Sequence, residues 1–344
     1  MTNPTSMRAA VVTAPETIHI QTVPMPDVPS GWSLIKCDYT GLCGTDFSIL
    51  HGSHPRAKFP LIMGHEISGT VVKSTLDGPA LGTRVTCEPL ISCGECGPCK
   101  RGDGHVCRNL RLFGIDKPGS MSEYVALPND RLIAIPEGVS LALAALTEPL
   151  AVAVHAVEMS PLAAGDAVAI FGAGPIGMLT ALVARNSGAS RVVIVEPSVE
   201  RARVAESLGF ETISSNANVT EALSARTNGE GFDVVFDAAA HPSVAELLAS
   251  SVRPKGAIIL VGIYKKPALV DLQALCFKEV SMTGVRVYTR RDVERAVDLI
   301  ANDSLNLSSF PIDIYPLEET ALAFEKAQAA SGVLKVLVKA GEVL

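Results

Sequence analysis

The chain has 344 residues, of which 48% are hydrophobic and 19% are charged, a balance typical of a globular protein with room for two domains. Its 29 basic and 36 acidic residues give a net charge of -7, which argues against a nucleic-acid or anionic-membrane partner. The longest apolar stretch, residues 141–157, is interrupted by Thr147, Glu148 and Pro149, so we expect no membrane span. The N-terminal residues lack the pattern of a signal peptide, and we therefore expect a cytoplasmic protein.

The first 140 residues contain short β-rich runs separated by Gly and Pro. This pattern predicts an antiparallel or barrel-like domain with few helices. The expected strands are residues 8–12, 34–39, 69–73, 84–86 and 122–127.

From residue 141 the sequence becomes Ala-rich, and from residue 167 strand and helix patterns alternate. The alternation predicts βαβ units, and hence a doubly wound α/β domain whose parallel sheet is covered on both faces. The expected elements are strand 167–171, helix 175–186, strand 191–195, helix 200–208, and two further buried strands at 234–237 and 257–261.

The last 60 residues or so have no place in a parallel sheet that is already complete. We therefore expect this tail to return to the first domain. Its predicted elements are a helix over 291–301, an extended segment over 312–315, a helix over 319–330 and a strand over 333–338.

A glycine-rich turn follows the first strand of the alternating region. Gly172, Gly174 and Gly177 have Gly-x-Gly-x-x-Gly spacing, with Pro175 and Ile176 between the last two. This spacing suits a tight turn, close approach of a pyrophosphate to the backbone, and close helix packing. Such a turn alone could be purely structural. Here it lies between a strand and a helix, so we predict a dinucleotide site.

Glu196 ends the next predicted strand, nineteen residues after Gly177. A carboxylate there can accept both ribose hydroxyls of NAD. A 2′-phosphate at about 4 Å would be repelled by on the order of a few kcal/mol, which disfavours NADP. Arg201 is the plausible local cation, and it could instead flank the ribose. We predict NAD, with Glu196 and Arg201 among the cofactor-binding residues.

Four of the eight cysteines lie within fifteen positions of one another. Clustering at short intervals favours one metal ion over disulfides between distant segments. Four thiolates suit tetrahedral zinc without an open position, so we predict a structural zinc; an iron centre or a redox pair is the alternative. The predicted ligands are Cys93, Cys96, Cys99 and Cys107.

A second, open metal site is suggested by Cys43-Gly-Thr45-Asp46 and by Gly64-His65-Glu66. A lone Cys or His is more often a packed core residue than a ligand. Together with the glycine turn and the four cysteines, however, these segments resemble the zinc-dependent medium-chain dehydrogenases over the whole chain. The similarity is to the branch of sorbitol, threonine, and L-gulonate and L-galactonate 5-dehydrogenases.

This resemblance implies a GroES-like catalytic domain over residues 1–148, completed by residues 287–344, and a Rossmann NAD-binding domain over residues 149–286. It implies a homodimer or homotetramer with two zinc ions per chain, one catalytic and one structural. Cys43 and His65 would bind the catalytic zinc, and the Thr45 hydroxyl would touch the substrate alcohol. The carboxylate ligand is either Glu66 or Glu148, directly or through water, and Glu66 could instead support the ligands from outside.

The sequence departs from the family at the proton relay. Relatives commonly carry a histidine five residues after the first zinc ligand, where this chain has Ser48. His51 lies three residues further, on the same face if a helix begins at Gly44. His51 either replaces the relay histidine or is a surface residue.

The resemblance implies reversible oxidation of a secondary hydroxyl to a ketone, with hydride transfer to the nicotinamide. The run from His51 to Pro60 is similar to that of sugar-acid and polyol dehydrogenases, with Arg56 and Lys58 suited to a carboxylate. We expect a polyol, sugar or sugar-acid substrate; threonine or a short secondary alcohol is the alternative. A zinc-ribbon nucleic-acid module would not explain the net charge or the open site, and a zinc-free quinone reductase would not use the cysteines.

Overall fold

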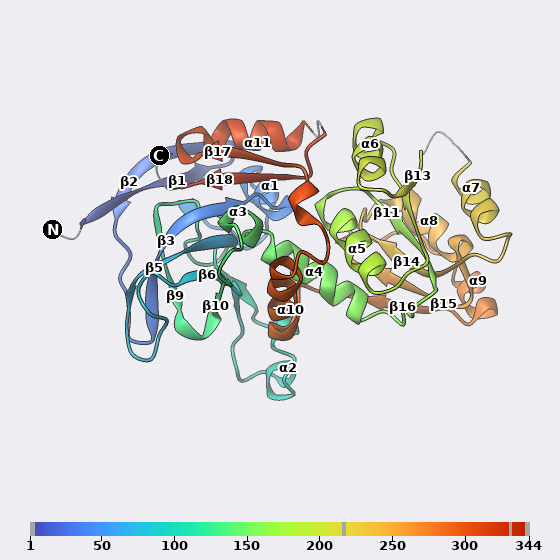
Figure 1. Ribbon diagram of the computed structural model, residues 1–344, viewed down its shortest axis with the longest axis horizontal. Helices are drawn as coiled ribbons and strands as arrows, with labels where there is room; N and C mark the ends of the chain where they lie inside the picture. Colours follow the sequence, from blue (N-terminus) through green and yellow to red (C-terminus); the bar gives the residue numbers. More distant parts are fainter. Residues whose placement is uncertain (1–3, 215–217, 330–331, 341–344) are drawn as a thin grey trace.

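The computed structural model describes residues 4–214, 218–329 and 332–340, and Figure 1 shows two lobes side by side. One lobe is rich in β-strands and contains both ends of the chain. The other is a parallel sheet with helices on both faces. Helices α4 (Thr147–Glu158) and α10 (Arg290–Ala301) lie between the lobes and pack against each other.

The β-rich lobe contains three sheets within the described residues. A three-stranded sheet has the order β2-β1-β4, a larger one has the order β10-β6-β5-β3-β18-β17 with β9 paired to β3, and β7 pairs with β8. Most predicted strands fall inside observed ones, but β9 begins two residues later than predicted. Strands β2, β4, β7, β8 and β10 were not predicted. The bounds are β1 Ser6–Ala14, β2 Thr17–Pro24, β3 Trp32–Gly41, β4 Leu61–Ile62, β5 Glu66–Ser74, β6 Arg84–Cys87, β7 Leu90–Ile91, β8 Arg111–Leu112, β9 Tyr124–Pro128 and β10 Leu132–Ala134.

Short helices connect these strands. The first, α1, directly follows β3 and begins one residue after Cys43. The bounds are α1 Gly44–Leu50, α2 Gly97–Lys100 and α3 Leu141–Ala144, with 3-10 turns at Gly104–Val106 and Asn129–Arg131.

The second lobe is a six-stranded parallel sheet in the described residues, with the order β13-β12-β11-β14-β15-β16. The buried strands β11 and β14 are central, as expected for a sheet covered on both faces. Strands β12 and β13 lie on one side of β11, and β14, β15 and β16 lie on the other. The direction in which strands are added therefore reverses at β11, and open α/β sheets bind ligands at such a switch point. The bounds are β11 Ala167–Phe171, α5 Pro175–Asn186, β12 Arg191–Val195, α6 Val199–Ser207, β13 Glu211–Ile213, α7 Val219–Arg226, β14 Phe232–Asp237, α8 Pro242–Ser251, β15 Val252–Leu260, α9 Leu272–Lys278 and β16 Ser281–Gly284.

The tail after β16 runs back to the β-rich lobe through α10 (Figure 1). Strand β18 (Lys335–Lys339) pairs antiparallel with β3, Leu337 lying opposite Gly41, and β17 (Ile312–Pro316) pairs parallel with β18. Helix α11 (Thr320–Gln328) ends before Ala330, the predicted end, which lies outside the described residues. This pairing places Lys335 beside the end of β3.

Helix α4 runs across residue 148, where the sequence places a domain boundary. It packs against α5 of the parallel-sheet lobe and against α10. The exact domain limits therefore stay a prediction. In the part of the chain that the structure describes, we find no helix with the length and apolar character needed to cross a membrane.

Candidate active site

The glycine turn joins β11 to α5. Gly172 has a φ of 102°, a conformation that favours glycine, and a Cβ on Gly177 would lie 1.9 Å from the Gly172 carbonyl oxygen. A Cβ on Gly174, by contrast, would meet nothing within 4 Å, so open space lies above the start of α5. Pro175 and Ile176 form the first turn of that helix, whose N-terminus attracts anions. The predicted turn thus leaves room for a pyrophosphate.

Glu196 follows β12 and is buried beside the glycine turn. Its Oε2 accepts a hydrogen bond from the Ala173 backbone N–H at 2.7 Å, and its Oε1 accepts one from Ser198 at 2.8 Å. The negative charge therefore lies next to the turn, where the motif predicts the ribose. Arg201 lies half-buried in the first turn of α6, and its backbone N–H bonds to the Ser198 hydroxyl.

The four clustered cysteines converge on one point. The Sγ–Sγ distances are 3.4 Å for Cys96–Cys99, 3.5 Å for Cys93–Cys107, 3.8 Å for Cys96–Cys107 and 4.0 Å for Cys93–Cys99. Tetrahedral zinc with Zn–S bonds of about 2.3 Å needs sulfur atoms about 3.8 Å apart. Two backbone N–H groups, of Cys93 and Asn109, also donate to Cys107 Sγ. The donor set fits a closed zinc site.

Cys43, His65 and Glu66 form a second group of potential metal ligands. One ligand atom from each lies within 4.8 Å of the others. Cys43 comes from the loop between β3 and α1. Glu66 begins β5, which pairs with β3, and His65 directly precedes it. Gly41 makes the arrangement possible, because a Cβ there would lie 1.9 Å from Glu66 Oε2. Three donors leave a tetrahedral metal with one open position.

The electrostatics of this group favour a cation. Although burial lowers the pKa of His65, the charges of Asp46 and Cys43 raise it well above its ordinary value. Asp46 is itself fully buried, and its Oδ2 accepts a hydrogen bond from the Cys43 backbone at 2.9 Å. Its Oδ1 lies 3.8 Å from His65 Nδ1, and neither atom has a hydrogen-bond partner among the described residues. The donors present thus fit a zinc ion, with Asp46 placed to support both ligands.

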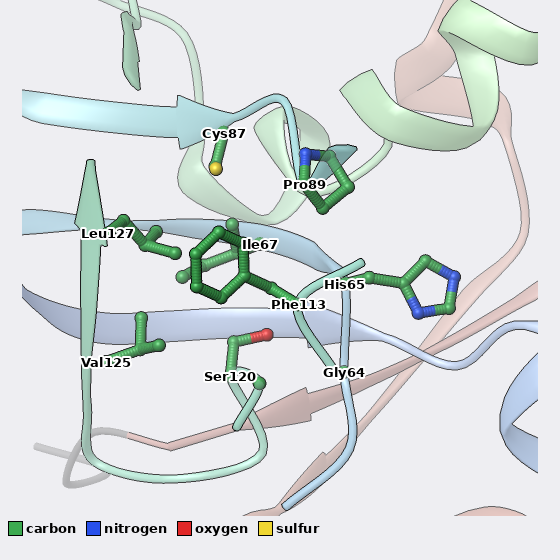
Figure 2. Close-up of a pocket in the computed structure, with 10 residues that line it drawn as sticks. Gly64, His65, Ile67, Cys87, Pro89, Phe113, Ser120, Val125 and Leu127 are labelled. Carbon is green, nitrogen blue, oxygen red and sulfur yellow. The ribbon is translucent and has the colours of Figure 1, made fainter. Parts of the chain in front are cut away.

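His65 lies at one end of a small cavity with mostly apolar walls. Figure 2 shows the ring pointing away from this cavity, which Phe113 and Leu127 also line. The cavity measures about 10 Å³, enough for about one water and too small for a substrate. This cavity therefore is not the substrate pocket.

Lys335 forms a buried ion pair with Glu66. Lys335 is only 3% exposed, and its ammonium donates to Glu66 Oε1 at 2.5 Å and also contacts Oε2. Burial raises the pKa of Glu66 to about 7, even though Lys335 opposes this. The Glu66 carboxylate thus belongs to the metal-ligand group and is also paired with the Lys335 ammonium.

Glu148 does not belong to the ligand group that the structure identifies in its described residues. It lies buried in the first turn of α4, where its Oε1 accepts a hydrogen bond from the Tyr288 hydroxyl at 2.8 Å. The negative charge of Glu148 nevertheless raises the pKa of His65, so it lies within electrostatic reach of the site. This geometry favours Glu66 as the direct ligand and Glu148 as the nearby carboxylate.

The remaining predicted residues lie along α1. Thr45 is half-exposed on the first turn, two residues after Cys43. Ser48 and His51 follow, and His51 Nε2 lies 3.4 Å from Gln328 Nε2 of α11 and 3.7 Å from the Glu16 carboxylate. His51 is therefore placed at the outer end of α1, and its relay role stays a prediction. Arg56, expected to attract a carboxylate, is already paired with Asp116 at 3.2 Å.

Three residues at the site were not predicted: Asp46, Tyr288 and Lys335. Asp46 carried a local signal, since it lies three residues after Cys43 within the quoted motif. Tyr288 and Lys335 had none, because they are 140 and 269 residues from their partners Glu148 and Glu66.

Both lobes match protein families that are already known. Residues 29–137 match the family model described as the alcohol dehydrogenase GroES-like domain, and residues 175–302 match the zinc-binding dehydrogenase model. The chain is 35% identical to 2-dehydro-3-deoxy-L-galactonate 5-dehydrogenase of Pseudoalteromonas atlantica, over 88% of this chain and 89% of the relative. It is 34% identical to L-threonine 3-dehydrogenase of Bacillus subtilis, over 88% and 90% of the two chains.

Among solved structures, the chain resembles a protein described as a zinc-binding dehydrogenase from Sinorhizobium meliloti bound to NADP. The TM-score is 0.90 at 30% identity, over 98% of this chain and 100% of the other. The similarity therefore covers both lobes.

The fold and site define a metal-binding oxidoreductase with a nicotinamide cofactor. The chain belongs to the zinc-dependent medium-chain dehydrogenase family, in the group of NAD(P)-dependent alcohol and polyol dehydrogenases. The predicted combination of a GroES-like domain and a Rossmann domain is confirmed. The family acts on small-molecule alcohols.

Proposed function

We propose that the protein oxidises a secondary hydroxyl of a polyol, sugar or sugar acid to a ketone, reversibly, with NAD as the hydride acceptor. The observation that carries this proposal is the grouping of Cys43, His65 and Glu66 within 4.8 Å. Three donors of this kind suit a catalytic zinc with an open position. The four-cysteine loop would hold a second, structural zinc.

A zinc ion held by Cys43, His65 and Glu66 would supply a Lewis acid that lowers the pKa of the substrate hydroxyl. The residues of the chain would do the rest. The Thr45 hydroxyl would accept the proton of the substrate and pass it toward solvent. The glycine turn and Glu196 would hold the cofactor so that the hydride leaves the same carbon that carried the hydroxyl. Alcohol and NAD⁺ thus give ketone, NADH and one proton.

The substrate class is supported by the similarity to a sugar-acid dehydrogenase. The test is a panel of polyols, hexonates, threonine and short secondary alcohols, each assayed with NAD and with NADP for reduced cofactor. We expect the highest kcat/KM with a polyol or hexonate and NAD. A clear preference for threonine or a short alcohol would overturn the proposed class. No turnover with any alcohol would overturn the proposed reaction.

Glu196 supports NAD over NADP. We predict that Glu196→Ala combined with Pro197→Arg shifts preference toward NADP, because the repelling carboxylate is removed and a guanidinium can pair with the 2′-phosphate. The measurement is kcat/KM for both cofactors. Since Glu196 also accepts the Ala173 and Ser198 amides, Glu196→Gln is the matched control, which retains an acceptor without the charge. An unchanged cofactor ratio would place specificity elsewhere.

His51 is proposed as the outer end of the proton relay. His51→Gln should lower alcohol oxidation near neutral pH by roughly ten- to a hundredfold, the scale of a general base, and this loss should largely vanish at high pH. The double change Ser48→His, His51→Gln should recover the neutral rate, because it restores a histidine at the usual position. A wild-type pH profile for His51→Gln would return His51 to the role of a surface residue.

We further propose a cytoplasmic homodimer or homotetramer. The reduced, clustered cysteines support the compartment. The assembly is supported by β16, which forms one end of the parallel sheet, and by exposed apolar side chains nearby on residues 263–277. Ile263, Leu269, Leu272 and Phe277 are each more than 70% exposed. Sedimentation should give two or four times the chain mass of 36.0 kDa, and a monomer would contradict the proposal.

A further inference from the structure

Tyr288 is a fully buried tyrosine whose hydroxyl faces a carboxylate of the proposed site. Its side chain is 0% exposed, and its hydroxyl donates to Glu148 Oε1 at 2.8 Å. Buried hydroxyl groups are almost always paired, and a bond to an ionised acceptor is stronger than one between neutral groups. The phenol hydroxyl is the donor of this bond, and the Glu148 carboxylate is the acceptor.

The backbone around Tyr288 is strained. Val287 has a φ of 44°, an unusual conformation for a β-branched residue. Such strain persists only where the surrounding structure fixes the segment, and it is common near functional sites. Val287 lies directly before Tyr288, in the segment that connects β16 to α10.

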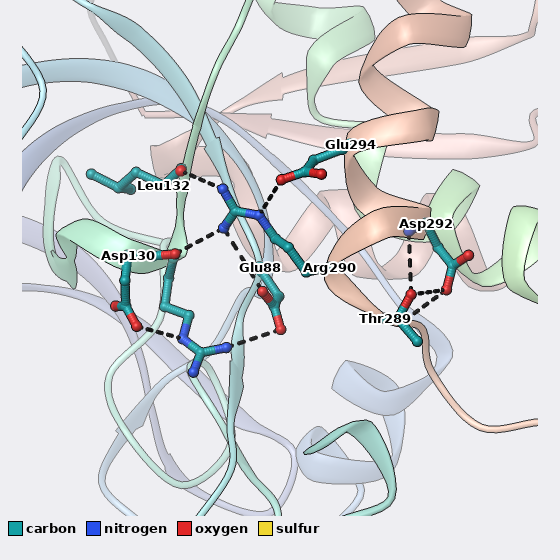
Figure 3. Close-up of polar contacts among 8 residues, drawn as sticks. Glu88, Asp130, Leu132, Thr289, Arg290, Asp292 and Glu294 are labelled. Atoms are coloured by element: carbon teal, nitrogen blue, oxygen red, sulfur yellow. Dashed lines mark hydrogen bonds and ion pairs between the residues drawn. The ribbon is translucent and has the colours of Figure 1, made fainter. Parts of the chain in front are cut away.

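The residues after Tyr288 anchor the segment on two sides, as Figure 3 shows. Thr289 and Asp292 cap α10 by bonding to each other. Arg290 donates to the backbone carbonyls of Asp130 and Leu132 at 2.8 and 3.0 Å, and to Glu294 at 2.9 Å. Tyr288 is thus held by the β-rich lobe and by α10 at once.

A second contact fixes the same segment against α4. His155 Nδ1 lies 2.9 Å from Asp292 Oδ2, in a buried hydrogen bond. His155 and Glu148 are seven residues apart, so they lie about two turns apart on one face of α4. Tyr288 and Asp292 therefore hold α4 at two points, but only Tyr288 bonds to a residue of the proposed site.

We propose that Tyr288 is a positioning residue that fixes the Glu148 carboxylate beside the open metal site. The proposal rests on the proposed function, since it assumes a catalytic metal at Cys43 and His65. With one oxygen held by Tyr288, the other oxygen of Glu148 has a defined direction in which to accept a hydrogen bond at the open site. Groups of this kind commonly change metal affinity or activity by about 10- to 100-fold when they are removed.

The test compares Tyr288→Phe with Asp292→Asn. Phenylalanine retains the ring and removes only the donor, whereas Asp292→Asn disturbs the other contact to α4 and leaves Glu148 untouched. Cobalt(II) is exchanged into the open site, and its visible absorption spectrum and dissociation constant are measured together with kcat/KM. We expect Tyr288→Phe to alter the cobalt spectrum and lower kcat/KM by about 10- to 100-fold. Asp292→Asn should lower thermal stability and leave the spectrum unchanged.

A double-mutant cycle shows whether Tyr288 acts through Glu148. In a Glu148→Ala background, Tyr288→Phe should leave the cobalt spectrum unchanged and should change kcat/KM by no more than about twofold. This comparison also serves if the single variant is unstable, because removing both partners of a buried hydrogen bond costs less than removing one. An equal loss in both backgrounds would overturn the proposal.

The two proposals fail in different ways. A wild-type protein that binds no cobalt at the open site and oxidises no alcohol would contradict the proposed function, and the role of Tyr288 with it. An active wild type whose Tyr288→Phe variant retains its cobalt spectrum and kcat/KM would contradict the role of Tyr288 alone.

Discussion

Cys43→Ala is expected to abolish turnover and to remove one zinc per chain. Cys43 is one of the three donors grouped at the open site, and two donors from His65 and Glu66 hold zinc poorly. Loss of the Lewis acid removes several kcal/mol of transition-state stabilisation, or about a thousandfold or more in rate. Binding of NAD should remain close to wild type, because the glycine turn and Glu196 are unchanged. The measurements are kcat, zinc content and the Kd for NAD.

Cys37→Ala is the matched control. Cys37 is fully buried in β3, six residues before Cys43, and is not part of either ligand group in the described residues. It should cost some stability through lost packing and leave zinc content and kcat unchanged. Wild-type turnover in Cys43→Ala would contradict the catalytic assignment.

Cys96→Ser is expected to lower stability far more than it slows the chemistry. Structural zinc contributes its binding energy to folding, and a weakened ligand loses on the order of a few kcal/mol of it. For a domain of ordinary size, that loss lowers Tm by roughly 5 to 10 °C. Thermal unfolding, zinc content and kcat at a temperature below the transition measure the two effects separately.

Cys276→Ser is the control for this variant, since Cys276 is exposed on α9 and lies outside both ligand groups in the described residues. Its stability should stay within about 0.5 kcal/mol of wild type. If Cys96→Ser loses hydride transfer at full stability and full zinc content, the four-cysteine site is not structural.

The parallel-sheet lobe could be predicted closely because its signals are local. β11, α5 and β12 begin and end as the sequence predicts. Buried strands read as continuous apolar runs, and the glycine turn marks the strand-to-helix junction. The two ligand groups were also found from local spacing, since the cysteines lie within one short loop and His65 is followed directly by Glu66.

The sequence did not reveal the contacts that support the site. Lys335 reaches Glu66 only because β18 pairs with β3, and Tyr288 reaches Glu148 only because the chain returns between the lobes. Such pairings depend on the tertiary fold, and no spacing in a single sequence encodes them. For this reason the sequence left open which glutamate, Glu66 or Glu148, binds the metal directly, because the choice depends on these partners.

Zinc content measured against turnover is the most direct test of the central claim. The purified protein should contain two zinc ions per chain. Gentle chelation should remove the one at Cys43, His65 and Glu66 first, because this site is open, whereas the four-cysteine site is closed. Alcohol oxidation should fall in proportion to that first zinc while the fold is retained, and added zinc should restore it. Full NAD-dependent turnover with only the four-cysteine zinc present would contradict the assignment.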